Sequence, residues 1–174
     1  MLQFLNLHPE IFGLDINDVA LKIIKLKKKG RAFHLVSFNE VALRPGVVTE
    51  GVVQDKPALI DAIKTALAGI KGEKLGTKYV AISLPEEKSF FQVIQMPKMT
   101  EEELASAVPF EAENYIPLTT DKVYMDFQVI SSHQEEKESD HLDVLINLMP
   151  LHMINSYTEC MVSLRLVRYI TGIV

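Results

Sequence analysis

The stretch LDINDVALK, residues 14–22, indicates more about the fold than any other part of the sequence. It reads as the end of one apolar strand, a tight turn, and the start of a second strand. An acidic residue, Asp15, closes the first strand, and a basic residue, Lys22, follows in the second. Backbone N–H groups in such a hairpin can hold a phosphate, with the acid helping to hold its metal ion. The candidate nucleotide-phosphate residues are therefore Asp15, Asn17 and Lys22.

The turn itself argues against nucleotide chemistry. Asn17 and Asp18 stand where small residues, usually glycine, would let the backbone approach a phosphate, and they add bulk and negative charge. The sequence also lacks a P-loop, a dinucleotide-binding glycine run and a serine-hydrolase elbow. We therefore predict that the chain is not an enzyme, has no catalytic residue and needs no cofactor.

The first 86 residues predict an α/β arrangement. A helix is predicted after Asp55, with Pro57 in its first turn, and its apolar residues recur from Leu59 to Ile70 before a stop at Lys71-Gly72. Strands are predicted on both sides of this helix, at 12–16, 19–26, 32–41 and 78–84. This order of strands, a crossover helix and a returning strand is typical of α/β domains.

Residues 87–160 predict a different module, in the order strand, helix, strand, strand, helix. Thr100 and Glu103 form a capping box that starts the first of these helices, and Pro109 is expected to kink it. The strands are predicted at 89–96, 123–130 and 142–148, and the last helix is predicted from Pro150.

Composition excludes several classes of protein. The 174 residues have a net charge of −5, which gives no basic surface for nucleic acid. The single cysteine, Cys160, fits a reducing cytoplasm, and the apolar start of the chain is too short for a membrane span. None of the five histidines has other ligand residues at metal-site spacing, so we predict no metal.

Several motifs together resemble the N-terminal half of the PilM family of type IV pilus assembly proteins, which are actin-like and related to the cell-division protein FtsA. The resemblance runs from about Phe12 to Cys160. The motifs that carry it are GLDI at 13–16, AISLP at 81–85, QMPKM at 95–99, EEEL at 101–104, FEAE at 110–113, YIP at 115–117 and VYMDFQV at 123–129.

The resemblance implies an actin-like (ribonuclease H-like) half-domain of α/β class with an inserted strand-helix-strand-strand-helix subdomain. The expected parts are residues 1–86 in the α/β domain, 87–160 in the insertion, and 161–174 as the start of a return to the α/β domain. It also implies a cytoplasmic scaffold, peripheral to the inner membrane, that docks the N-terminal tail of an inner-membrane PilN-like partner. The apolar corner after the capped helix, residues Tyr115, Ile116, Pro117 and Leu118, is the candidate peptide site.

Two other functions remain open at this point. The first is an actin-like ATP-binding protein or a fragment of one, since ATP and Mg²⁺ belong to the family's fold. We expect no counterpart here of the second half of that fold, which supplies the adenosine pocket. The second is an unrelated α/β binding domain.

Overall fold

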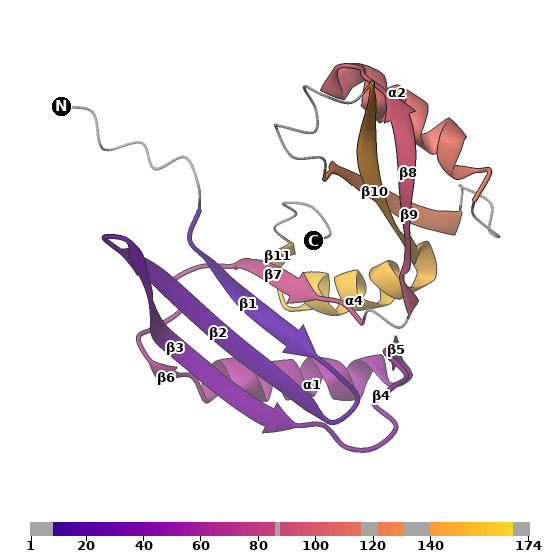
Figure 1. Ribbon diagram of the computed structural model, residues 1–174. Coiled ribbons are helices and arrows are strands. Elements are labelled where there is room, and N and C mark those ends of the chain that lie inside the picture. The colour runs from indigo at the N-terminus through magenta and orange to yellow at the C-terminus, as the bar shows by residue number, and fades with distance from the viewer. Residues whose placement is uncertain (1–8, 86–87, 116–121, 131–139, 169–174) are drawn as a thin grey trace. The chain divides into compact units, whose positions relative to one another are not determined.

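The computed structural model describes residues 9–85, 88–115, 122–130 and 140–168 (Figure 1). The chain divides into two compact units. The first consists of Met1–Glu87 and Asn155–Ile170, and the second of Lys88–Ile154 and Thr171–Val174. In the described part of the chain, no helix is long and apolar enough to cross a membrane.

The first unit is built on a six-stranded sheet with the order β11-β7-β1-β2-β3-β6. Strands β1, β2 and β3 pair as an antiparallel meander, while β7 pairs parallel to both β1 and β11. A separate two-stranded hairpin, β4 with β5, precedes the first helix. The strand bounds are β1 Ile11–Ile16, β2 Ala20–Lys29, β3 Ala32–Ala42, β4 Val48–Thr49, β5 Val52–Val53, β6 Lys71–Gly72, β7 Tyr79–Ser83 and β11 Val167–Arg168.

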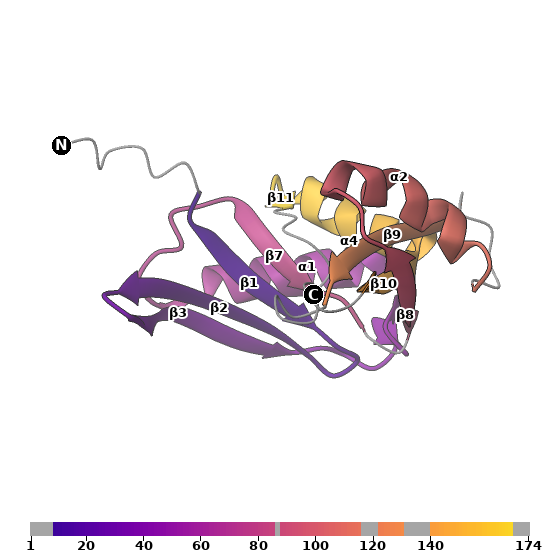
Figure 2. The ribbon, with the colours of Figure 1, turned by 45° about the horizontal axis from the view of Figure 1, so that its top comes forward.

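The core of this unit lies between the sheet and two helices, α1 (Lys56–Ala68) and α4 (Leu151–Ser163). The Asp55 side chain accepts a hydrogen bond of 2.9 Å from the Ala58 N–H, which caps α1 as predicted. One apolar cluster joins alternate residues of β1 and β2 to both helices, including Leu59 and Ile63 of α1 and Met161 of α4. The sheet is therefore covered by α1 along one face (Figure 2).

The end of α1 differs from the prediction, because the helix stops at Ala68 and Ile70 lies beyond it. Gly69 is the C-terminal cap, and the Asn39 side-chain amide donates to the Ala66 carbonyl oxygen at 2.7 Å. The expected stop, Lys71-Gly72, instead forms β6 beside β3. Pairing with a neighbouring strand thus ends the helix earlier than its apolar spacing indicates.

The second unit contains a three-stranded antiparallel sheet with α2 packed on one face. The order is β8-β10-β9, and the bounds are β8 Phe90–Pro97, α2 Glu101–Ala112, β9 Val123–Val129 and β10 His141–Pro150. The predicted capping box is confirmed, because Thr100 and Glu103 each bind the other's backbone N–H. Leu104, Val108 and Ala112 bury the apolar stripe of α2 against this sheet.

The predicted α/β, actin-like class is confirmed. The inserted module was predicted at 87–160, whereas the main segment of the second unit covers residues 88–154. The difference lies in α4. Its residues from Asn155 onward belong to the first unit, where Tyr157, Cys160 and Met161 are buried in the core. After α4 the chain enters the first sheet as β11.

Candidate functional site

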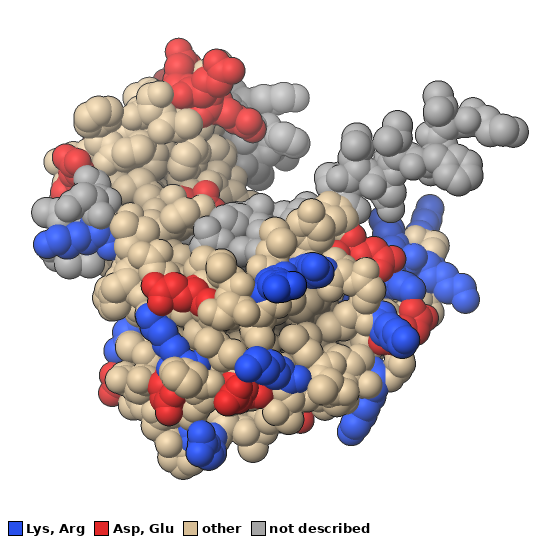
Figure 3. Space-filling view, turned by 180° about the vertical axis from the view of Figure 1, so that it is seen from behind, with Lys and Arg blue, Asp and Glu red and all other residues tan. Residues whose placement is uncertain are grey.

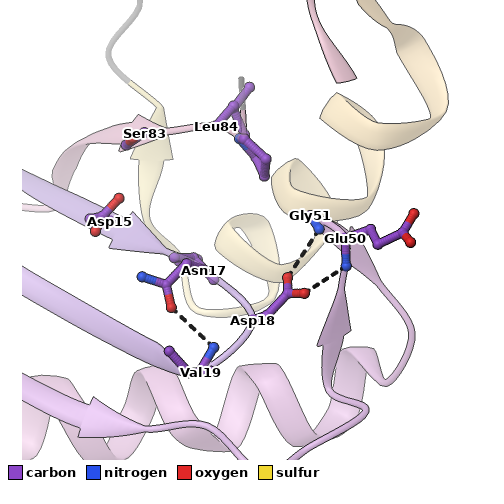
Figure 4. A pocket seen from close by; sticks show the side chains of 10 residues that line it. Asp15, Asn17, Asp18, Val19, Glu50, Gly51, Ser83 and Leu84 are labelled. Atoms are coloured by element: carbon purple, nitrogen blue, oxygen red, sulfur yellow. Dashed lines mark hydrogen bonds between the residues drawn. The ribbon is translucent and has the colours of Figure 1, made fainter. Parts of the chain in front are cut away.

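A pocket of about 450 Å³ lies in the first unit, at the end of β1 that holds the predicted phosphate hairpin (Figure 4). Three chain segments line it. They are the β1–β2 turn at residues 15–19, the β4–β5 turn at Glu50 and Gly51, and residues 83–85 at the end of β7. The parallel pairing of β1 with β7 brings Asp15 level with Ser83, so two strand ends meet at this pocket.

The Asn17 side chain closes the β1–β2 turn from within. Its Oδ1 accepts hydrogen bonds from the backbone N–H groups of Val19, at 3.0 Å, and Ala20, at 2.9 Å. The Asn17 N–H in turn donates to the Ala20 carbonyl oxygen at 3.0 Å. These backbone donors are the groups that a phosphate hairpin would offer to a ligand, and here the chain itself occupies them.

The Asp18 carboxylate binds the β4–β5 turn in the same way. Oδ2 accepts from the Glu50 N–H at 2.7 Å and Oδ1 from the Gly51 N–H at 3.0 Å (Figure 4). Glu50 and Gly51 have φ values of 48° and 72°, a left-handed turn that directs both donors at one acceptor group. Asp18 therefore acts as a built-in anion on a turn that could otherwise bind one.

Tyr157 of α4 fixes the same turn from the core side. Its hydroxyl donates to the Gly51 carbonyl oxygen at 2.8 Å, and the side chain is 1% exposed. Burial, together with the negative charge of Asp18, raises the pKa of Tyr157 to about 12, so the hydroxyl stays protonated at neutral pH. A Cβ on Gly51 would lie 2.4 Å from the Cβ of Pro85, so only glycine fits there.

These contacts do not fit a bound nucleotide. The pocket brings together Asp15 and Asn17 of the predicted phosphate site, but Lys22 does not line it. Three carboxylates, of Asp15, Asp18 and Glu50, line it instead and would repel a polyphosphate. Among the described residues, no group of three or more His, Cys, Asp or Glu side chains could hold a metal ion. The residues here do not fit ATP with Mg²⁺.

The predicted peptide corner is described only at its first residue. Tyr115 follows α2 in a turn closed by its N–H on the Ala112 carbonyl oxygen at 2.9 Å, and its side chain is 46% exposed. Ile116, Pro117 and Leu118 lie outside the described residues. Tyr115 lies three residues beyond Ala112, and its exposure shows that the buried stripe of α2 ends at Ala112.

Sequence reasoning missed a second apolar group on α2. Phe110 is 76% exposed, and with Met99 and Ala107 it lines a shallow hollow of about 760 Å³. Its position was a usable signal, because it lies two residues from both Val108 and Ala112 and so off the buried stripe. The start of α2 is acidic, at Glu101 to Glu103, and these charges gather at the top of the view in Figure 3.

The chain is similar to a known family and to solved structures. The family model of the type IV pilus assembly protein PilM matches residues 13–171. A chain of a solved PilM-PilN type IV pilus biogenesis complex is 28% identical with a TM-score of 0.77, over 93% of this chain and 46% of that one.

A second solved structure shares the fold alone. The cytoplasmic domain of EpsL, an inner membrane component of the type II secretion system of Vibrio cholerae, is 11% identical with a TM-score of 0.53. It matches 92% of this chain and 56% of that one, so the chain spans about half the length of both solved structures. The family model matches nearly the whole length of the chain, and the matched chain of the solved PilM-PilN complex has the same fold. The chain therefore belongs to the PilM family of type IV pilus assembly proteins.

Proposed function

We propose that this chain is a cytoplasmic scaffold of type IV pilus assembly that docks the N-terminal tail of an inner-membrane PilN-like protein. The observation that carries the proposal is the family match over residues 13–171, joined to a structural match with a chain of a PilM-PilN complex. The scaffold would reach the inner membrane through its partner.

The contacts at the β1–β2 turn count against an ATPase. Its backbone donors are occupied by Asn17 and Asp18, and its lining is acidic. An actin-like ATPase would need these donors for phosphate. Asp15 lines the pocket, but the occupied donors and the acidic lining count against the ATP-binding alternative.

The end of α2 supports the docking site. Tyr115 and Phe110 are both exposed aromatic side chains, and aromatic anchors dominate the affinity of most peptide interfaces. An extended tail gains affinity from main-chain hydrogen bonds and from a few such anchors. We place the tail's apolar residues against Tyr115 and the residues that follow it.

Calorimetry with a synthetic tail peptide tests the proposal. A peptide of about a dozen residues from the cytoplasmic N-terminus of the PilN-like protein is expected to bind, and Tyr115→Ala to cost about 1 to 3 kcal/mol of binding free energy. Tyr79→Ala is the matched control, because Tyr79 is a similarly exposed tyrosine on β7 of the first unit. Circular dichroism checks that both variants remain folded.

Two results would count against the proposal in different ways. If no tail peptide binds, the docking function itself is contradicted. If the peptide binds but Tyr115→Ala and Tyr79→Ala leave its affinity equally unchanged, the function stands and the site lies elsewhere.

A further inference from the structure

One face of the sheet in the first unit is left open. Strands β1, β2 and β3 bury alternate side chains against α1 and α4, and no helix of the described residues packs on the opposite face (Figure 2). Five large apolar side chains of β2 and β3 are between 45% and 67% exposed there. We call them the open sheet face: Ile24, Leu26, Phe33, Leu35 and Phe38.

Strand register makes these side chains one continuous patch. Ile24 pairs with Phe38, and Leu26 pairs with Leu35. Phe33 belongs to the next pair on the same face. A register shift between Lys25 and Leu26 inserts one extra residue into β3 and keeps the pairs in line. Cross-strand neighbours on one face touch, and contiguous exposed apolar surface of this kind marks interaction sites.

The patch is basic at the end of the β2–β3 hairpin. Lys28, Lys29 and Arg31 make no ion pair among the residues that the structure describes, whereas Lys27 is paired with Glu73 at 2.5 Å. Lys and Arg side chains gather over this end at the right of Figure 3. At the other end of the face, Lys22 lies in register between Asp15 and Glu40, so its charge is balanced.

We propose that the open sheet face binds an amphipathic α-helix of a partner protein, with acidic residues of that helix reaching Lys28, Lys29 and Arg31. Strands β2 and β3 pair antiparallel, and the solvated face of such a pair normally carries polar side chains, so an apolar row there indicates a covering partner. A helix about 10 Å wide also matches the two strands that carry the patch, which lie about 4.8 Å apart. The basic hairpin end selects an acidic helix over a basic one.

Designed peptides test this proposal without knowledge of the natural partner. The probe is a fluorescein-labelled helix of about 18 residues with leucine at positions i, i+3, i+4 and i+7 and glutamate along both margins. A twin carries lysine in place of every glutamate. Fluorescence anisotropy is expected to show that the glutamate peptide binds roughly ten-fold more tightly than the lysine peptide. This difference in affinity is expected to shrink at about 0.5 M salt.

Matched variants locate the binding surface. Phe33→Glu adds a charge to the patch at its most exposed side chain, and we expect it to weaken the glutamate peptide by roughly ten-fold or more. Phe91→Glu makes the same change at an exposed phenylalanine of β8 and is expected to leave affinity unchanged. Circular dichroism confirms folding, and Leu35→Glu serves if Phe33→Glu does not fold.

Four results would overturn the proposal. They are no binding of either peptide, equal binding of the two peptides, equal loss in Phe33→Glu and Phe91→Glu, and Phe33-dependent binding of phosphatidylglycerol vesicles without peptide binding. A further contrary result would be self-association, measured by sedimentation, that Phe33→Glu abolishes while neither peptide binds. The occupant of the open sheet face would then be a second copy of the chain and not a partner helix. None of these results depends on whether a PilN-like tail docks at Tyr115.

Discussion

Removal of one buried hydroxyl, by Tyr157→Phe, is expected to lower stability by an amount that shrinks as pH rises. The hydroxyl donates to the Gly51 carbonyl oxygen at 2.8 Å in a fully buried contact. Its loss leaves that carbonyl oxygen without this donor and is expected to cost about 1 to 2 kcal/mol of unfolding free energy at neutral pH.

The pKa of Tyr157 determines what happens in alkali. The folded state holds the proton up to a pKa of about 12, against 10.0 for the free side chain, because burial and Asp18 disfavour the phenolate. Between these values the unfolded chain binds fewer protons than the folded one, so stability present below pH 10 is lost as pH rises. Allowing for solvent screening, this loss is about 1 kcal/mol by about pH 11. Phenylalanine cannot ionise, so the variant escapes the loss.

Urea unfolding of both proteins at about pH 7 and about pH 11 measures the effect, with the midpoint compared at constant slope. The advantage of the wild type is expected to shrink by about 1 kcal/mol at the higher pH. Ionisation of groups that do not interact with Tyr157 affects both proteins alike and cancels in the difference. Tyr79→Phe, which removes a partly exposed hydroxyl, is the control. A wild-type advantage that is the same at both pH values would refute the reasoning.

Two further predictions follow from the same pocket. Gly51→Ala is expected to lower unfolding free energy by at least about 1 kcal/mol more than Gly30→Ala, because both residues have positive φ but only Gly51 meets Pro85; equal midpoints in urea would show that Pro85 moves aside. Calorimetry with millimolar Mg-ATP is expected to give no saturable heat, because Asn17 and Asp18 occupy the donors of both turns; micromolar binding would contradict this description of the pocket.

The capped helices are the best case for prediction from sequence. The box of Thr100 with Glu103 and the cap at Asp55 involve residues three positions apart, so local spacing alone determines them. The strand periodicity likewise predicted β1, β2 and β3 to within three residues at each end. Short strands such as β4, β5 and β6 were missed, because two paired residues leave no periodic signal.

The candidate site was also predictable only in part. Asn17 and Asp18 were recognised as unfavourable for phosphate because their chemistry is evident from residue type. Their actual partners were not predictable, since Asp18 binds Gly51, which is 33 positions away, and Tyr157 binds the same turn from 106 positions away. Phe110 lies outside the buried stripe of α2, but the sequence analysis did not recognise it as an exposed aromatic side chain.

The sequence by itself determined the α/β class, the family and the loss of a glycine hairpin, because these depend on residue order and on spacing within single elements. The tertiary structure alone decided how the hairpin donors are used, how α4 is shared between the two units, and which sheet face is open. Contacts between distant segments depend on strand order and register, and a shift of one residue moves every side chain to the other face.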